Sequence, residues 1–202
     1  MNQHQRTEQW FKEREGKLTA SAFGQAAGLG PSSRQQLWRR IMGMEPPFEG
    51  NPATDWGTEK EPVAIEAYSK TTVAEVELVG FMKHKDYDWL GGSPDLLVGV
   101  SGMGEVKCPF SQELYDEIPA YYMAQMQGCL EITDREWCDF ICWTPTKMSV
   151  TRVMRSDEYW QWLHVRLADF WTYVQACCEP PRAKKHTPPD VEIYGTTIIE
   201  FN

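Results

Sequence analysis

The sequence lacks a long hydrophobic run, and no stretch approaches the roughly 20 apolar residues that a membrane-spanning helix requires. We expect no signal peptide, because residues 1–14 are too polar to form an apolar export segment. No internal repeat or low-complexity segment occurs, which excludes the collagenous and disordered classes. We therefore expect a soluble, globular, cytoplasmic protein.

Basic residues are outnumbered by acidic ones, with 20 Lys and Arg against 29 Asp and Glu and a formal net charge of −9. This balance argues against a broad surface for binding phosphate groups. It does not exclude a nucleic-acid partner, because a narrow basic groove can lie on an acidic body.

The six cysteines include no CxxC pair and no nearby histidine at the spacing of a zinc site. We expect them to be reduced thiols in the core or in strands. They are Cys108, Cys129, Cys138, Cys142, Cys177 and Cys178.

The chain is long enough for one large domain. A domain of 202 residues buries roughly 70% of the surface that its unfolded chain exposes. We expect residues 1–202 to form a single domain. The composition changes only near the end, where residues 179–202 are rich in proline and locally basic, which predicts an extended C-terminal tail.

Periodicity and capping signals predict helices early in the chain, hairpin-linked strands in the middle and a further helix between later strands. The expected helices span residues 7–15, 19–27, 33–43, 58–70, 120–131 and 160–174, and the expected strands 73–81, 95–100, 104–108, 137–143 and 148–154. Pro62 fits only if it lies in or beside the first turn of its helix. This order predicts an α/β (α+β) fold with a central mixed sheet flanked by helices.

The most informative segment is Ser93-Pro-Asp95, followed ten residues later by Glu105-Val-Lys107. Side chains alternate along a strand, so Glu105 and Lys107 share one face. A hairpin can bring the carboxylate of Asp95 toward Glu105. Two carboxylates offer the hard oxygen ligands that Mg²⁺ prefers, and a lysine can orient or deprotonate an attacking water. The spacing predicts metal-assisted hydrolysis of a phosphodiester.

An alternative interpretation is a surface strand on which charged and apolar residues alternate. The expected turn at residues 101–104 also centres the hairpin near Gly102, which pairs Asp95 beyond Glu105. On this register, the hairpin needs a bend or a bulge to bring the two carboxylates together.

Two further polar residues favour a nuclease. Glu61, Ile65 and Tyr68 lie on one face of the expected helix, where a carboxylate needs a partner. That partner is either a metal ion or a buried Lys or Arg. Gln125 lies among apolar neighbours in a similar way.

Five motifs follow one another over most of the chain: Trp10-Phe-Lys-Glu-Arg14 with Leu18-Thr-Ala-Ser21, Trp56-Gly57 with Glu61, Ser93-Pro-Asp95, Gly104-Glu-Val-Lys-Cys-Pro109, and Tyr122-Met-Ala-Gln125 with Gln127. In this order they resemble the lambda-exonuclease type of the PD-(D/E)xK nucleases, the YqaJ-like viral recombinase exonucleases. The resemblance implies a restriction-endonuclease-like core.

The resemblance also implies roles for particular residues. Asp95, Glu105 and the backbone carbonyl of Val106 would hold metal, and Lys107 would be the catalytic lysine. Two further catalytic groups around the metals and the nucleophile would be Glu61 and Gln125. The 5′-terminal phosphate would be bound by Arg14, Ser21 and Ser93, which agrees with the match between the arginine fork and phosphate oxygens.

The implied activity is a Mg²⁺-dependent 5′→3′ exonuclease, with two ions and with Mn²⁺ as a substitute. It would digest one strand of linear double-stranded DNA to 5′-mononucleotides and leave a 3′ single-stranded overhang for recombination by strand annealing. The resemblance further implies a ring-shaped homotrimer around DNA and a single-strand-annealing protein as partner. We expect basic residues of the channel among Arg34, Arg39, Arg40, Lys184 and Lys185.

Alternatives of two classes remain open. One is another enzyme of the same fold, either a restriction-type endonuclease or an iron–sulfur nuclease, although the cysteines lack the spacing of a cluster site. The other is a DNA-end-binding module without catalysis, which would not need Asp95, Glu105 and Lys107 together. Relatives also carry an apolar wedge before the Trp-Gly pair, where Asn51-Pro-Ala-Thr54 offers nothing bulky, so Met44, Pro47 or Phe48 would have to replace it.

Overall fold

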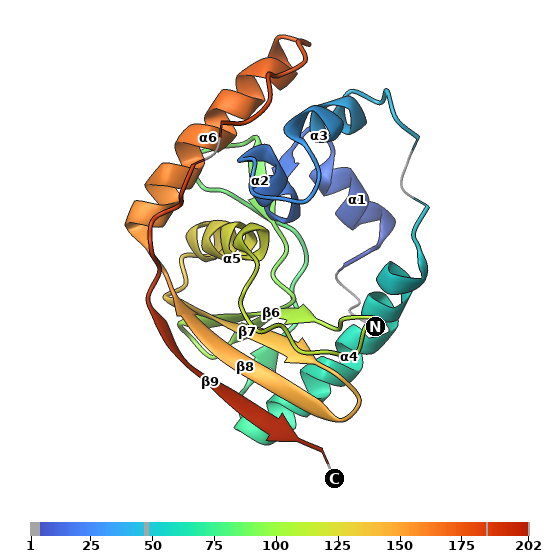
Figure 1. Ribbon diagram of the computed structural model, residues 1–202, viewed down its shortest axis with the longest axis vertical. Coiled ribbons are helices and arrows are strands. Elements are labelled where there is room, and N and C mark those ends of the chain that lie inside the picture. Colours follow the sequence, from blue (N-terminus) through green and yellow to red (C-terminus); the bar gives the residue numbers. More distant parts are fainter. Residues whose placement is uncertain (1–4, 47–48, 185, 202) are drawn as a thin grey trace.

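The computed structural model describes residues 5–46, 49–184 and 186–201, and Figure 1 shows a sheet with helices packed around it. The helices are α1 (Glu8–Arg14), α2 (Ala20–Ala26), α3 (Arg34–Ile41), α4 (Pro52–Thr72), α5 (Ala120–Thr133) and α6 (Asp157–Gln175). The strands are β1 (Leu18–Thr19), β2 (Val76–Glu77), β3 (Met82–Lys83), β4 (Leu90–Gly92), β5 (Leu96–Val98), β6 (Gly102–Lys107), β7 (Trp137–Trp143), β8 (Lys147–Met154) and β9 (Ile193–Glu200). Among the described helices, none has the length and apolar character needed to cross a membrane.

The larger sheet has six strands in the order β2-β5-β6-β7-β8-β9. Strands β6 and β7 are parallel, whereas every other pair of neighbours is antiparallel. A parallel pair needs a long crossover connection, which α5 supplies between β6 and β7. The predicted α/β fold with a central mixed sheet is therefore confirmed. A smaller three-stranded sheet has the order β1-β4-β3.

Two apolar clusters cover the two faces of the larger sheet. On one face, Ile65 and Tyr68 of α4 pack with Val106 of β6. On the other face, Met103 of β6 packs in a cluster that includes residues of α2, α3, α5 and α6. Because Met103 and Glu105 are two residues apart on one strand, Glu105 points toward the α5 side of the sheet, away from Val106. Strand β6 thus lies between two helical layers.

The hairpin between β5 and β6 turns earlier than the sequence predicts. Leu96 pairs with Gly104 and Val98 with Gly102, so the turn occupies residues 99–101. Gly99 adopts a φ of +52°, a conformation that glycine tolerates without steric cost. This register continues to place Asp95 beside Glu105, so the expected turn at residues 101–104 and the expected bulge were both wrong.

Helix α4 begins earlier than predicted. The side chain of Asn51 accepts hydrogen bonds from the amides of Ala53 and Thr54, both at 3.0 Å, and Pro52 occupies the first turn. Pro62 therefore lies inside the helix, contrary to the expected position in or beside the first turn. A proline there removes one backbone hydrogen bond, and burial of the apolar α4 face compensates for that loss.

The end of the chain joins the sheet. Residues 179–192 form no helix or strand where they are described, but residues 193–200 pair with β8 as β9. No clear pattern predicts this strand, because most of its side chains are exposed and the alternation of polar and apolar residues is weak. The expected extended tail is thus tied to the sheet over its last part.

Asp139 of β7 is a buried carboxylate for which the sequence holds no motif. It is 2% exposed, and it accepts hydrogen bonds from the Tyr68 hydroxyl at 2.7 Å and from Arg152 Nε and Nη2 at 2.8 and 2.9 Å. These contacts join α4, β7 and β8.

We expect Asp139→Ala to lower the free energy of unfolding by about 2 kcal/mol. The loss stays below that of a fully buried ion pair, because the Arg152 side chain is 43% exposed and water can solvate it. Urea denaturation measures the change, and Asp139→Asn, which keeps an acceptor, should lose less. Equal stability of the alanine variant and the wild type would contradict this assignment.

Candidate active site

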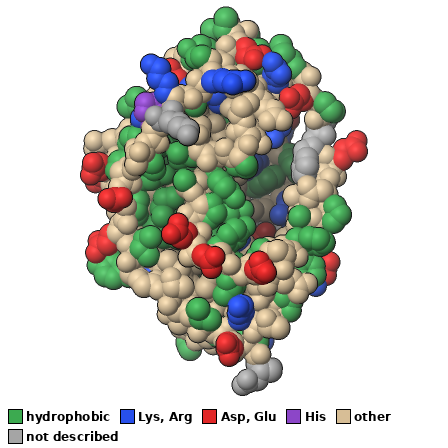
Figure 2. Space-filling view, viewed as in Figure 1, with side chains coloured by type: hydrophobic (Ala, Val, Ile, Leu, Met, Phe, Trp, Pro, Cys, Tyr) green, Lys and Arg blue, Asp and Glu red, His purple; other side chains and the backbone are tan. Residues whose placement is uncertain are grey.

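One cavity of about 210 Å³ contains every residue to which the sequence assigns a catalytic, metal-binding or phosphate-binding role. Figure 2 shows the surface hollowed between α1 and α4, which both contribute to this cavity. The nine predicted residues in its lining are Arg14, Ser21, Glu61, Ser93, Asp95, Glu105, Val106, Lys107 and Gln125. They come from segments more than 100 positions apart, so only the fold brings them together. Their individual roles remain predictions.

The centre of the cavity is built by β6 and the residue that precedes β5. Asp95 Oδ2 accepts a hydrogen bond of 2.7 Å from the amide of Val106. Lys107 Nζ donates to Glu105 Oε1 at 2.6 Å, which agrees with the shared strand face predicted for this pair. Gln125 of α5 donates to the same oxygen at 2.6 Å. Glu105, 1% exposed, is therefore held from two sides.

The Glu61 side chain enters the cavity from α4, and an arginine lies beside it. Arg6 Nη2 lies 3.5 Å from Glu61 Oε2. A cation is therefore present beside Glu61, but the Arg6 side chain is 47% exposed, so it is not the buried Lys or Arg that the sequence left open. No motif pointed to Arg6, because the chain before α1 carries no periodic signal.

Burial dominates the electrostatics of the carboxylates. It raises the pKa of Glu105 to about 7, and burial together with the charge of Asp95 raises the pKa of Glu61 to about 7. Burial also raises the pKa of Asp95. Burial alone would lower the pKa of Lys107, but the charges of Glu105 and Asp95 outweigh it and raise that pKa above its usual value. Lys107 is therefore held as a cation.

The donor set fits a hard divalent cation. Glu105 Oε2 is buried and has no hydrogen-bond partner in the described part of the chain. In a strand, the N–H and C=O of one residue point the same way, so the Val106 carbonyl faces the gap in which Asp95 accepts the Val106 amide. The described residues form no group of three or more His, Cys, Asp or Glu side chains that could hold a metal alone. Mg²⁺ needs no such group, because it binds through one or two carboxylates and keeps several waters.

The other end of the cavity is built around Arg14. Its guanidinium lies 4.0 Å from the centre of the Trp10 ring, and Nη2 donates to Thr19 Oγ1 at 3.3 Å. The Thr19 hydroxyl lies 3.2 Å from that of Ser21, and Trp10 Nε1 donates to Ser93 Oγ at 3.0 Å. Burial lowers the pKa of Arg14 to about 10, so the group still carries its charge at neutral pH.

No carboxylate pairs with Arg14 among the described residues. A partly desolvated cation without an acidic partner is an unbalanced charge, which an anion can neutralise. The sequence analysis did not single out Thr19 or Trp10 for this role, although both lie inside the first motif pair.

A second cavity of about 440 Å³ adjoins the first and shares Arg6, Glu61, Val106 and Lys107 with it. Its remaining wall includes the first turns of α4 and the aromatic side chains of Phe110, Tyr115 and Tyr122. The shared residues, Lys107 and Glu61 among them, thus lie between the 210 Å³ cavity and the 440 Å³ cavity. Of the side chains considered as wedges, Met44 is 64% exposed, whereas Pro47 and Phe48 lie outside the described residues.

All six cysteines are free, four of them buried and two exposed after α6. The expectation of reduced thiols in the core or in strands is met by the four buried cysteines, but it was wrong for Cys177 and Cys178, which are exposed and lie outside the strands.

Residues 9–136 match the YqaJ-like viral recombinase domain, and this stretch contains all nine predicted site residues. The fold is similar to an alkaline exonuclease, LHK-Exo, from Laribacter hongkongensis, with a TM-score of 0.74 and 31% identity over 84% of this chain and 93% of that one. A structure of LHK-Exo in complex with dAMP gives a TM-score of 0.74 and 30% identity over the same shares.

Two further matches have lower sequence identity to this chain. A phage-related exonuclease from Haemophilus somnus 129PT has a TM-score of 0.60 and 16% identity over 80% of this chain and 94% of that one, which supports the fold alone. Protein R354 of Acanthamoeba polyphaga mimivirus is 27% identical over 156 residues. That match covers 68% of this chain but 28% of the mimivirus protein.

Proposed function

Because the chain belongs to the family of YqaJ-like viral recombinase domains and is a deoxyribonuclease, we propose that it is a Mg²⁺-dependent 5′→3′ exonuclease on linear double-stranded DNA. It releases 5′-mononucleotides from one strand and leaves a 3′ single-stranded overhang. The observation that carries this proposal is the cavity in which an unpaired arginine lies at one end and buried carboxylates at the other.

Each group in the site has a separate role in the proposed reaction. A Mg²⁺ ion held by Asp95, Glu105 and the Val106 carbonyl would polarise the scissile phosphate and lower the pKa of a bound water. The ammonium of Lys107 offsets negative charge that develops on the phosphate. Gln125 fixes the orientation of Glu105 through its 2.6 Å hydrogen bond.

The direction of digestion follows from the end of the cavity that binds the terminal phosphate. Arg14, Ser21 and Ser93 hold the 5′-phosphate, and the next phosphodiester then lies at Asp95 and Glu105. The rest of the strand continues into the 440 Å³ cavity, where Phe110 offers an exposed ring to a base. LHK-Exo is known in complex with dAMP, which belongs to the class of product proposed here.

We propose that residues 1–202 act as one nuclease domain within a homotrimeric ring. A ring encloses the DNA, so that an enzyme with an acidic exterior stays on its substrate. The 3′ overhang would be taken up by a single-strand-annealing protein.

The proposal is tested by comparing linear duplex with covalently closed circular duplex of the same sequence. We expect mononucleotides from the linear DNA in Mg²⁺, none from the circle and none in EDTA. An Asp95→Asn preparation controls for contaminating nucleases. Cleavage of the circle would indicate an endonuclease, and binding of ends without any product in Mg²⁺ or Mn²⁺ would indicate a module without catalysis.

A further inference from the structure

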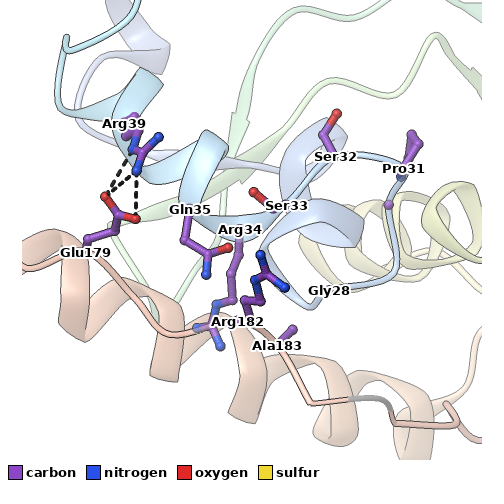
Figure 3. A pocket seen from close by; sticks show the side chains of 11 residues that line it. Gly28, Pro31, Ser32, Ser33, Arg34, Gln35, Arg39, Glu179, Arg182 and Ala183 are labelled. Atoms are coloured by element: carbon purple, nitrogen blue, oxygen red, sulfur yellow. Dashed lines mark hydrogen bonds and ion pairs between the residues drawn. The ribbon is translucent and has the colours of Figure 1, made fainter.

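A third cavity, of about 540 Å³, lies where the chain between α2 and α3 meets the segment that follows α6. We call it the arginine pocket, after Arg34, Arg39 and Arg182, which line it (Figure 3). Its walls are in close contact, since a Cβ atom built on Gly28 would lie 2.3 Å from the Cβ of Ala183. The pocket is therefore a feature of the packed fold.

Positive charge predominates in the arginine pocket. Among the described residues that line it, Glu179 is the acidic one, and it accepts two hydrogen bonds of 3.0 Å from Arg39 (Figure 3). Arg34 is 9% exposed, and its Nη2 donates to Asp169 at 2.7 Å. Arg34 Nε is buried without a hydrogen-bond partner in the described part of the chain. Arg182 has no carboxylate partner among the same residues.

Arg34 and Arg182 together fit an anion. Figure 3 shows both side chains in the same part of the pocket, and both also line an adjoining cavity of about 530 Å³ that contains Lys184. Asp169 already balances the charge of Arg34, whereas Arg182 has no carboxylate partner in the described part of the chain, so the two guanidinium groups together leave one positive charge that an anion can balance. Their planar donors match the oxygens of a phosphate. A protein with a net charge of −9 thus concentrates cations at this place.

Helix α2 connects the arginine pocket with the active site. Ala20 and Ser21, at its start, line the active-site cavity, and Gly28, just beyond its end, lines the arginine pocket. Seven residues of helix rise by about 10 Å. Gln25 fastens α2 to the wall of the arginine pocket, because it accepts from Arg40 Nη2 of α3 at 2.9 Å and donates to the carbonyl of Ser33, which lines that pocket, at 2.8 Å.

The position of the arginine pocket relative to the proposed 5′-phosphate site decides which strand of the DNA can reach the pocket. The digested strand ends at its terminal phosphate, so the DNA that extends beyond that point is the complementary strand. At a rise of about 3.4 Å per nucleotide, 10 Å corresponds to roughly three nucleotides.

We propose that the arginine pocket binds a backbone phosphate of the undigested strand, a few nucleotides beyond the 5′ end, and so guides the growing 3′ tail. This inference rests on the proposed exonuclease function. Contacts of this kind are independent of base sequence, as digestion of any linear DNA requires. A phosphate monoester, either inorganic phosphate or the mononucleotide product, shares the chemistry and is distinguished by experiment.

The test measures binding in EDTA, where nothing is hydrolysed. Fluorescence anisotropy compares a 5′-phosphorylated duplex carrying a six-nucleotide 3′ tail with the blunt duplex. We expect the wild type to bind the tailed DNA about fivefold more tightly, and Arg182→Glu to abolish this preference without weakening the blunt complex. Arg182→Ala should lower the slope of log affinity against log salt by about one for the tailed DNA. Arg182 is exposed, so neither change should affect folding.

Lys70→Ala is the matched control, because Lys70 is an exposed cation on the far end of α4. It should retain the preference for tailed DNA. A wild type that binds both duplexes equally, or an Arg182→Glu variant that keeps the preference, would overturn the proposal. So would loss of the preference in millimolar inorganic phosphate or dAMP, which would assign the pocket to a monoester. Failure of the exonuclease function itself would appear separately, as absence of product from linear DNA in Mg²⁺.

Discussion

Asp95→Asn and Glu105→Gln should each reduce the initial rate on linear, 5′-phosphorylated duplex by on the order of a thousandfold, which corresponds to about 4 kcal/mol of transition-state stabilisation. Both substitutions keep the size of the side chain and remove the charge that a divalent cation needs. Folding should survive, because burial already disfavours the charged form of both groups and raises the pKa of each. Rates are measured by release of labelled mononucleotide.

A readout independent of activity is the binding of Mn²⁺, followed by electron paramagnetic resonance. Both amide variants should bind it at least tenfold more weakly. Glu66→Gln is the control, since Glu66 is an exposed carboxylate of α4 that pairs with Lys70. It should change neither rate nor binding. A rate within tenfold of the wild type in either site variant would remove that residue from the metal site.

Arg14→Gln should slow digestion of 5′-phosphorylated duplex by about a hundredfold and leave the slower reaction on 5′-hydroxyl duplex nearly unchanged. The reason is that Arg14 is partly desolvated, stacks on Trp10 and faces no carboxylate among the described residues. The phosphate that it binds sets the register of the next phosphodiester, and a displacement of about 1 Å can cost on the order of a hundredfold in rate.

Two variants make this result specific. Arg14→Lys keeps the charge but not the planar fork, so it should recover only part of the loss. Lys12→Ala removes an exposed cation from the same helix and should have no effect. If the wild type digested both kinds of end equally fast, Arg14, Ser21 and Ser93 would not form a phosphate site, whereas the metal site would be unaffected.

The sequence predicted which residues lie together in the site better than it predicted the path of the chain around them. Glu105 and Lys107 share a strand face because of a period of two residues, which is a local property, and their 2.6 Å contact agrees with it. Strand β7 and helices α5 and α6 were likewise expected close to their observed positions, since each carries a strong apolar pattern. Nine site residues were chosen from motifs, and all of them line one cavity.

Features that depend on contacts between distant segments were missed or misplaced. The β5–β6 turn lies at residues 99–101 and not at residues 101–104. Pairing of β5 with β6 sets this position, and Gly99 adopts the positive φ that the turn requires. Pro62 lies inside α4, because the apolar face of that helix packs on the sheet and tolerates a lost hydrogen bond. Neither outcome follows from local propensity.

The sequence by itself thus determined the fold class and the family, and it predicted which residues share the candidate site, because periodicity and the residues within each motif are local features of the chain. Only the tertiary structure decided that Arg6 would reach Glu61 and that β9 would close the sheet edge beside β8. It also decided that Arg34 and Arg182, 148 positions apart by their numbers, would share one pocket. Such contacts depend on how whole elements pack, and packing is set by the summed burial of many side chains that no single motif records.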